Sequence, residues 1–299
     1  MTIPTTPTEL RQFLAERGIT VDRKLGQHFL TDRNMLRWIA EQAELAPKDV
    51  VLEIGTGTGL LTNELARRAG VVVTVDMDAA MFALSRELLR DFKNVRQHHA
   101  DILEKRDKLN PAVLADVRDA MGSIPGALFK VVSNIPYGIS SPVIIDLVSG
   151  DLPYERIVLT IQLEVAERLV APSGSKDYGF LSVVTQYHSE TKILRQLPPQ
   201  VFWPQPKVNS AVVKLTPRAE KPPLKDYATF RAVARAIFDY RRKNFLNALA
   251  LSEIGKIGKT RIKDAIEKSG LDPLCRGESL TVAQICALAN FLSASDSRR

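Results

Sequence analysis

Short apolar and β-branched runs alternate with helical patterns along the first two thirds of the chain. The predicted strands span residues 50–54, 71–75, 95–99, 128–133 and 210–215. After the first of them, apolar residues from Leu60 to Ala66 follow the spacing of an amphipathic helix. Strands that alternate with helices are typical of an α/β fold with a mainly parallel sheet, so we predict a doubly wound, Rossmann-like domain.

From residue 217 onward, the pattern predicts helices and no strands. The predicted helices span residues 227–238, 242–251, 260–269 and 282–293. Prolines and alternating charges at 217–223 mark a boundary. We therefore predict an α/β domain over residues 1–216 and a small all-helical C-terminal domain over residues 217–299. Within the first domain, residues 104–126 are predicted to form an amphipathic helix that includes Leu109, which is long for a connection between strands.

The surplus of positive charge belongs to the predicted helical domain. The chain carries a net charge of +7, and residues 217–299 contain 16 Lys and Arg against 9 Asp and Glu, so the rest of the chain is balanced. A basic helical domain suits phosphate binding, in which each contact adds salt-dependent affinity and little sequence specificity. The residues predicted to contact RNA here are Arg231, Arg235, Arg241, Arg242 and Lys243. For any single one of them, a solvated helix face is the alternative.

A stiff loop at residues 202–207 also favours contact with nucleic acid. Its prolines fix the backbone and leave aromatic rings and Lys207 to meet RNA. The alternative is a rigid entry into the strand at 210–215.

The composition argues against a metalloprotein or a secreted protein. Cys275 and Cys286 are the only cysteines in the sequence, and no group of Cys, His and acidic residues has the spacing of metal ligands. We expect reduced thiols and no metal. The sequence has no apolar run long enough to cross a membrane, and residues 1–14 lack the pattern of a signal peptide. We therefore expect a cytoplasmic protein with no membrane association.

The strand at 128–133 leads into Asn134-Ile135-Pro136-Tyr137, which suits an exocyclic amine on a flat base. The amide of Asn134 and the carbonyl of Pro136 can accept hydrogen bonds from the amine, and Tyr137 can stack on the base. These three residues are the predicted catalytic residues for chemistry at adenine N6. The alternative is an ordinary turn after a strand.

The strand at 50–54 runs into Gly55-Thr56-Gly57-Thr58-Gly59 and then a helix. Glycines in this context let the backbone approach a ligand at a helix N-terminus. The Gly-x-Gly-x-Gly spacing favours S-adenosylmethionine over a nicotinamide cofactor. Asp76, about twenty residues further on, can accept both ribose hydroxyls with either cofactor.

Asp101 follows the strand at 95–99 and is predicted to receive the amino group of the cofactor's adenine; a helix N-cap is the alternative. In open parallel sheets, ligands bind outside the carboxyl ends of the strands, where all these candidates converge. The sequence shows neither a Gly-x-Ser-x-Gly elbow nor a phosphate-binding Gly-Lys-Ser/Thr loop, which disfavours a hydrolase or a phosphoryl transferase.

With these motifs the chain resembles the ribosomal RNA small-subunit adenine dimethyltransferase family (KsgA/RsmA) over nearly its whole length. The resemblance also includes Lys24–Leu30, Gln162–Leu169, Lys176–Gly179, Pro198–Val213 and Arg241–Lys243. It implies a Rossmann-like S-adenosylmethionine-dependent methyltransferase domain followed by a small all-helical domain. The implied cofactor-binding residues are Gln27, His28, Leu30, Glu53, Gly55, Gly57, Asp76, Asp101 and Asn134.

The chain departs from the family pattern at two positions. The family often has Asn where this chain has His28, and another Asn where it has Gly138. Imidazole can donate or accept a hydrogen bond, so we expect the pocket to be preserved, but the hydrogen bond that His28 makes is open.

The resemblance implies in-line methyl transfer to adenine N6, repeated to give dimethyladenosine, in the ribosomal RNA of an assembling 30S particle. The expected enzyme acts as a monomer. Three alternatives stay open: a macrolide-resistance type of methyltransferase that acts on large-subunit RNA, a DNA adenine methyltransferase, and an assembly factor whose catalysis is secondary.

Overall fold

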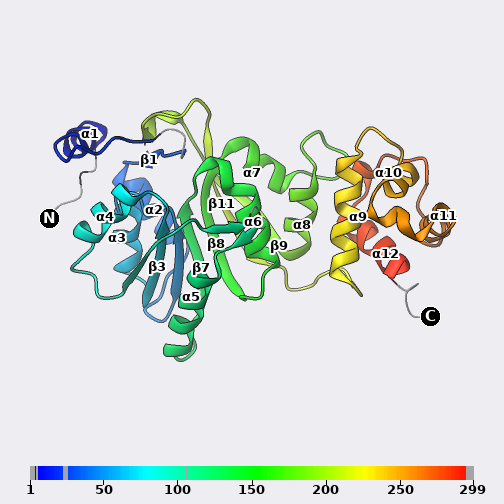
Figure 1. Ribbon diagram of the computed structural model, residues 1–299, viewed down its shortest axis with the longest axis horizontal. Helices are drawn as coiled ribbons and strands as arrows, with labels where there is room; N and C mark the ends of the chain where they lie inside the picture. Colours follow the sequence, from blue (N-terminus) through cyan, green and yellow to red (C-terminus); the bar gives the residue numbers. More distant parts are fainter. Residues whose placement is uncertain (1–3, 5, 23–25, 106, 294–299) are drawn as a thin grey trace. The chain divides into compact units, whose positions relative to one another are not determined.

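The computed structural model describes residues 4, 6–22, 26–105 and 107–293, so Lys24 and Leu25 of the first resemblance motif lie outside the described residues. The chain forms two compact units (Figure 1). The first comprises residues 1–166 and 191–217, and the second comprises 167–190 and 218–299. Residues 167–190 thus pack with the C-terminal helices. The functional boundary that we place between residues 216 and 217 stays a prediction.

A seven-stranded sheet forms the centre of the first unit. Its strand order is β4-β3-β2-β7-β8-β11-β9. The strands are β2 (Val50–Ile54), β3 (Val71–Asp76), β4 (Val95–His99), β7 (Phe129–Asn134), β8 (Tyr154–Gln162), β9 (Ser189–Leu197) and β11 (Ser210–Pro217). Strands β4, β3, β2, β7 and β8 are parallel, and β11 is antiparallel to β8. The predicted α/β class and the predicted strands are confirmed.

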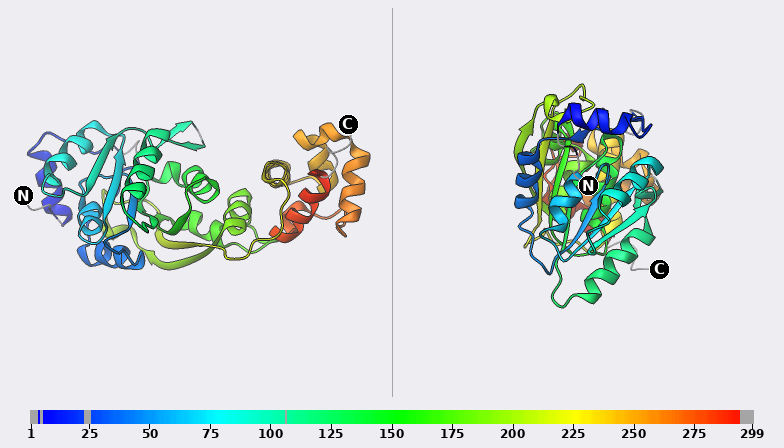
Figure 2. Two further views of the ribbon diagram at one scale, coloured as in Figure 1. Left: turned by 90° about the horizontal axis from the view of Figure 1, so that it is seen from below. Right: turned by 90° about the vertical axis from the view of Figure 1, so that its left-hand side faces the viewer.

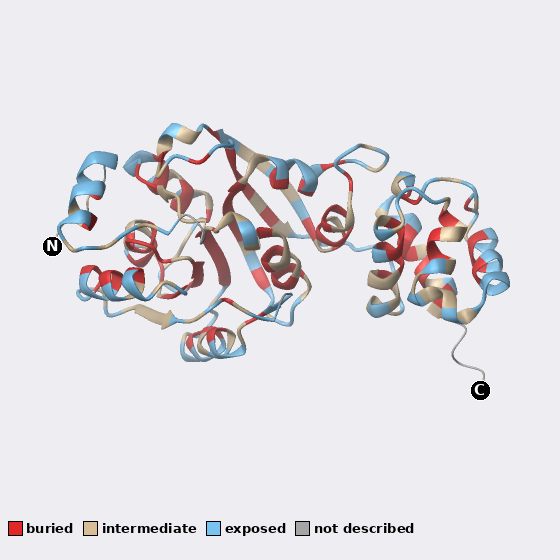
Figure 3. Ribbon diagram, turned by 45° about the horizontal axis from the view of Figure 1, so that its top comes forward, coloured by how far each residue is buried: buried red, intermediate tan, exposed pale blue. Residues whose placement is uncertain are grey.

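Helices cover both faces of this sheet (Figure 2). On one face, α2 (Arg33–Gln42) and α3 (Leu60–Ala66) pack against alternate strand residues in one apolar cluster. On the other face lie α5 (Pro111–Ser123) and α6 (Ser140–Ser149). The central strands are buried along their length, as Figure 3 shows. Burial on both faces explains why these strands are apolar runs rather than alternating patterns.

The chain reverses its direction of winding between β2 and β7. After β2 the chain adds β3 and β4 on one side, and then returns to place β7 on the other side of β2. Ligands bind at such a switch point, outside the carboxyl ends of the two strands. Ser133 joins these ends, because its Oγ accepts from the Ile54 nitrogen at 3.3 Å and donates to the Ile54 carbonyl at 2.5 Å.

The N-terminal segment is fixed to the first unit at two places. Helix α1 (Pro7–Ala15) begins with a capping box between Thr6 and Glu9 and buries Leu10 and Leu14 in an apolar cluster with α4 (Ala79–Leu88). Further on, β1 (Phe29–Leu30) pairs with β10 (Phe202–Trp203). The segment before α2 is therefore attached to a loop more than 170 residues away in sequence.

The prediction of a helix that includes Leu109 is wrong. A hairpin of β5 (Leu103–Lys105) and β6 (Lys108–Leu109) comes first, and α5 begins only at Pro111, with Asn110 as its N-cap. The hairpin is fixed to α6 because the Leu109 nitrogen donates to Asp146 Oδ2 at 2.9 Å. That long-range contact has no signal in the local sequence pattern.

The second unit is helical and has its own apolar core. Its helices are α8 (Phe180–His188), α9 (Tyr227–Asp239), α10 (Phe245–Leu251), α11 (Lys259–Lys268) and α12 (Val282–Ser293), and α7 (Leu163–Val170) spans the division between the units. The predicted start of α10 at residue 242 is wrong, because Asn244 caps the helix by accepting from the Asn247 nitrogen. Arg242 and Lys243 therefore precede the helix.

A buried ion pair lies on β7 of the first unit. Lys130 Nζ is 2.7 Å from Asp49 Oδ2 and also donates to the Glu44 carbonyl at 2.6 Å. The two side chains are only 5% and 0% exposed. Removing one partner would leave a buried charge without compensation.

We expect Lys130→Met to lower the free energy of unfolding by roughly 3 to 5 kcal/mol. Urea denaturation of the purified variant measures the change. The control is Lys48→Met at an exposed position beside Asp49, for which we expect a change within about 0.5 kcal/mol. Equal effects of the two substitutions would contradict a special role for the buried pair.

Candidate active site

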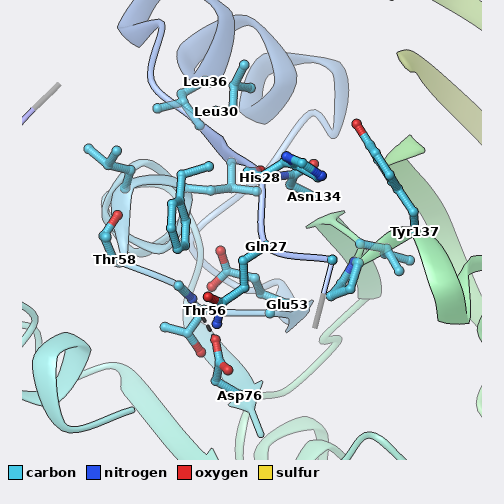
Figure 4. A pocket seen from close by; sticks show the side chains of 18 of the residues that line it. Gln27, His28, Leu30, Leu36, Glu53, Thr56, Thr58, Asp76, Asn134 and Tyr137 are labelled. Atoms are coloured by element: carbon cyan, nitrogen blue, oxygen red, sulfur yellow. Dashed lines mark hydrogen bonds between the residues drawn. The ribbon is translucent and has the colours of Figure 1, made fainter. Parts of the chain in front are cut away.

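A cavity opens at the carboxyl ends of β2, β3 and β7 (Figure 4). Its lining comes from segments that are far apart in sequence. They are residues 26–30, Leu36, Glu53, 55–58, Leu60, Leu61, Asp76, Met77 and 134–137. The structure thus brings together the predicted glycine loop, the predicted acid after β3 and the predicted base-holding residues.

The glycine loop adopts backbone conformations that favour glycine. Gly55 and Gly57 have φ angles of +83° and +53°. A Cβ at Gly57 would lie 2.9 Å from the Phe29 ring, and one at Gly55 would lie 3.4 Å from the Pro136 ring. The loop therefore needs glycine both for its conformation and for its close approach to neighbouring segments.

Asp76 ends β3 and is held by the backbone of two turns. Its Oδ2 accepts from the Gly57 nitrogen at 2.8 Å, and its Oδ1 accepts from the Asp78 nitrogen at 2.9 Å. Burial raises the pKa of the Asp76 carboxyl, while these two hydrogen bonds act in the opposite direction. Each oxygen keeps a further lone pair, with which it can accept a ligand hydroxyl.

Glu53, at the fourth position of β2, is the most deeply buried acid of the cavity lining. It is 1% exposed, and Thr62 Oγ1 donates to its Oε2 at 2.5 Å. Burial raises the pKa of Glu53 to about 8, and the nearby Asp76 adds to the shift. At neutral pH this side chain is largely a neutral acid, one that a positively charged ligand would ionise.

Asn134 and Tyr137 are held in place by partners from other segments. Asn134 Nδ2 donates to the His28 carbonyl at 2.8 Å, so its Oδ1 is the amide atom that can accept from a ligand. The Tyr137 hydroxyl is 2.6 Å from Ser210 Oγ, and burial raises the pKa of Tyr137. The Pro136 carbonyl accepts from the Ile139 nitrogen at 3.2 Å and, over a longer distance, from the Ser140 hydroxyl at 3.4 Å.

The segment 27–30 closes one side of the cavity. Gln27 Nε2 donates to Asp78 Oδ2 at 2.7 Å, and its Oε1 accepts from the Asp22 nitrogen at 3.0 Å. Its amide therefore holds the backbone of this segment in place. Leu30 is buried beside Leu36 in the lining. The sequence did not show which hydrogen bond His28 makes. In the structure, Nδ1 of its imidazole lies 2.6 Å from the Pro204 carbonyl and donates to it.

Asp101 is not among the residues that line this cavity. It is exposed, and its Oδ1 accepts from the Leu103 nitrogen at 2.9 Å. The alternative of a helix N-cap is wrong, because β5 follows. Its contact with the cofactor's adenine stays a prediction.

The residues predicted to contact RNA differ in their surroundings. Lys207, Arg235, Arg242 and Lys243 are exposed, and Arg231 is half-buried. Arg235 lies over the Phe180 ring at 5.0 Å. Arg241 is bound within the second unit, because it pairs with Glu278 and donates to the Lys176 carbonyl at 2.9 Å. Their contacts with RNA stay predictions.

Sequence reasoning missed three residues that shape the site. Phe29 packs against the glycine loop, Ser133 joins β2 to β7, and Ser210 holds the Tyr137 hydroxyl. Ser133 and Ser210 stand beside recognised motifs, but nothing in the local sequence indicates their distant partners.

Comparisons with known proteins agree with this geometry. A family model described as ribosomal RNA adenine dimethylase matches residues 19–294. The chain belongs to the ribosomal RNA adenine dimethylase family. The ribosomal RNA small subunit methyltransferase A of Geobacillus kaustophilus is 39% identical over 293 residues, covering 96% of each chain. The protein of the same name from Moorella thermoacetica is also 39% identical, covering 96% of this chain and 98% of its own.

Two solved structures are similar to this chain over most of its length. A dimethyladenosine transferase from Plasmodium falciparum has a TM-score of 0.66 and 25% identity, covering 87% of this chain and 96% of its own. The 23S ribosomal RNA methyltransferase ErmE has a TM-score of 0.60 and 29% identity, covering 89% and 99%. The predicted fold class, enzyme class and cofactor are confirmed: this adenine dimethylase uses S-adenosylmethionine to methylate adenines of ribosomal RNA.

The lining of this dimethylase cavity fits S-adenosylmethionine. The ligand carries positive charge at its sulfur and its amino group, and Glu53 and Asp76 supply two carboxyls. Gly55 and Gly57 keep the loop free of side chains that would fill the space. No group of His, Cys, Asp and Glu that could hold a metal ion occurs among the described residues. Within the same residues, no helix is long and apolar enough to cross a membrane.

The raised pKa of Glu53 predicts a pH-dependent stability. The folded dimethylase binds this proton more tightly than the unfolded chain does, so the stabilisation is complete below the ordinary pKa of 4.5 and is lost as the pH rises through about 8. As the pH rises across this range, we expect the free energy of unfolding of Glu53→Gln to increase relative to that of the unchanged protein, by up to about 1.4 kcal/mol per pH unit.

Urea denaturation between pH 5 and pH 9 tests this expectation. Glu41→Gln, at an exposed position of α2, is the control and should give a difference that does not vary with pH. A constant difference for Glu53→Gln as well would show that Glu53 is already ionised in the folded protein.

Proposed function

We propose that this chain dimethylates N6 of adenosines in the ribosomal RNA of the assembling small subunit, acting in the cytoplasm as a monomer. The relatives named small subunit methyltransferase A support this choice of subunit. The observation that best supports the proposal is that one cavity is lined by Gly55, Gly57 and Asp76 and also by Asn134 and Tyr137. The residues proposed to bind the cofactor and those proposed to hold the base therefore face the same space.

In this proposal, the lower part of the cavity in Figure 4 holds the cofactor. Asp76 accepts the ribose hydroxyls, and the glycine loop contacts the ligand through its backbone. Glu53 carries charge opposite the amino-acid end of the ligand, and Asp101 contacts its adenine. When bound, S-adenosylmethionine supplies a methyl group attached to a positively charged sulfur. The thioether that remains after transfer is a good leaving group.

Asn134, Pro136 and Tyr137 hold the target base. The adenine amine is a weak nucleophile because its lone pair is delocalised into the ring. Asn134 Oδ1 and the Pro136 carbonyl accept its two N–H groups and favour a more tetrahedral nitrogen. Stacking on Tyr137 contributes about 1 to 3 kcal/mol toward holding the base outside its helix.

No side chain has to act as a strong base in this arrangement. The amine becomes acidic as it gains the methyl group, so water can take the proton. For the second transfer, the monomethylated amine has one N–H left for one of the two acceptors. The added methyl group then turns away from the other acceptor.

The first test measures which nucleic acid is methylated. The purified protein is incubated with labelled S-adenosylmethionine and, separately, with undermethylated small subunits, large-subunit RNA and duplex DNA. We expect dimethyladenosine in the small subunit only. Label in large-subunit RNA would instead show that the protein is a large-subunit RNA methyltransferase, like ErmE. Label in DNA would show that it is a DNA methyltransferase. Tight subunit binding without label would favour an assembly factor.

Substitutions test the assigned roles in the same assay. We expect Asn134→Ala to lower kcat by about 100-fold, because an acceptor aligned in the transition state is lost. Tyr137→Ala should also lose methylation, and both variants should keep RNA binding in a filter assay. Loss of RNA binding by either variant would refute the assignment of roles.

We propose that residues 217–299 bind RNA through phosphate contacts. Arg242 and Lys243 are exposed just before α10, so they are the clearest candidates. The double substitution Arg242→Ala and Lys243→Ala should weaken small-subunit binding and reduce the slope of log affinity against log salt by about 2.

The matched control removes the same charge from the first unit. Arg90→Ala with Lys93→Ala changes two exposed residues near the end of α4. We expect the control to keep the salt dependence of the unchanged protein. Equal losses in both double variants would mean that net charge, rather than this site, governs binding.

A further inference from the structure

The ring of His28 lies against the ring of Tyr137. The two ring centroids are 5.3 Å apart with an interplanar angle of 28°, which is the geometry of a stacked pair. This separation leaves no room for a base between the two rings. A base that stacks on Tyr137 must therefore use its opposite face.

The backbone of His28 contacts the other base-holding side chain. Its carbonyl accepts from Asn134 Nδ2 at 2.8 Å, which fixes the orientation of the Asn134 amide. Figure 4 shows the His28 ring beside Asn134 and toward Tyr137, away from Asp76. His28 thus contacts both side chains that we assign to the target base.

His28 and Tyr137 are anchored at the two ends of one short connection, between β10 and β11. His28 Nδ1 donates to the Pro204 carbonyl at 2.6 Å, and the Tyr137 hydroxyl bonds Ser210 at 2.6 Å. Pro204 directly follows β10 and Ser210 is the first residue of β11, so the two anchoring residues lie at the two ends of one short connection. Tyr137 is therefore held at its hydroxyl by one end of this connection and on one ring face by a ring bound to the other end.

We propose that the ring of His28 is a positioning group for the target base. Its ring supports one face of Tyr137, so that the opposite face is presented to the adenine before RNA arrives. This inference rests on the proposed function, because it assumes that Tyr137 stacks on the base. It assigns the His28 ring, which stands where the family often has Asn, to the support of Tyr137.

Support of this kind adds to the rate without adding to the affinity for cofactor. A Tyr137 ring without His28 is free to leave the stacking position, so fewer bound bases are aligned for reaction. The backbone carbonyl that orients Asn134 is kept in any substitution of His28. Side-chain variants therefore isolate the ring contact.

Three substitutions separate the ring from its hydrogen bond. His28→Phe keeps a ring against Tyr137 and loses the bond to Pro204, His28→Asn keeps a donor and loses the ring, and His28→Ala loses both. We expect His28→Ala and His28→Asn to lower kcat about tenfold on undermethylated small subunits. His28→Phe should recover most of this loss.

Two binding measurements distinguish positioning from other roles. Calorimetry with S-adenosylmethionine and filter binding with small subunits should give dissociation constants within about twofold of the unchanged protein. His98→Ala is the matched control. His98 lies on β4, its Nε2 is 2.7 Å from Asp116 Oδ2 on α5, and it does not line the cavity. It should keep full activity.

A double-mutant cycle adds an independent readout. If His28 and Ser210 hold the same ring, the loss in His28→Ala with Ser210→Ala should differ from the product of the two single losses. Independent, multiplying losses would contradict a shared role.

The outcomes that overturn the inference are distinct from failure of the proposed function. Weaker cofactor binding with unchanged kcat at saturating cofactor would make His28 a cofactor contact. Full activity of His28→Asn would show that the ring is unnecessary, and increased activity of His28→Ala would show that His28 competes with the base. If the unchanged protein does not methylate small subunits, the proposed function itself fails.

Discussion

The adjacency of β2 and β7 is the constraint on which the active site depends. These strands are separated by about 75 residues in sequence, yet Ser133 bonds both the nitrogen and the carbonyl of Ile54. The glycine loop leaves one strand and Asn134 ends the other, so the tie between the strands sets the distance between cofactor and base. A shift of either strand would misalign a transfer that relies on position rather than on acid or base chemistry.

The N-terminal segment completes the site through contacts with chain that lies far away. Phe29 packs on Gly57, the His28 carbonyl orients Asn134, and the His28 ring lies on Tyr137. The segment is itself attached to β10 by β-pairing and to the Pro204 carbonyl by the His28 ring. One connected set of contacts therefore joins the two ends of the first unit to the residues that hold the base, which is the kind of support that a preorganised site needs.

Buried ionisable side chains are present both at the site and elsewhere in the sheet. The pair of Lys130 and Asp49 is a buried ion pair, and it serves structure. Glu53 is buried without a positive partner among its nearest contacts, and its pKa is raised to about 8. A folded protein that keeps such a buried acid beside a cavity gives up stability that a cationic ligand can restore.

The sequence by itself determined the α/β class, strands β2, β3, β4, β7 and β11, and the order in which the glycine loop, Asp76 and Asn134 appear, because apolar periodicity and turn chemistry are local properties; it did not predict β8 and β9. It also located the basic helical region. It failed at the hairpin that contains Leu109 and at the start of α10, where a contact with Asp146 and a cap by Asn244 override the periodic pattern. Only the tertiary structure decided the partners of His28, Tyr137 and Ser133, because those contacts join residues 73 to 176 positions apart, and local patterns carry no record of what lies across a sheet edge.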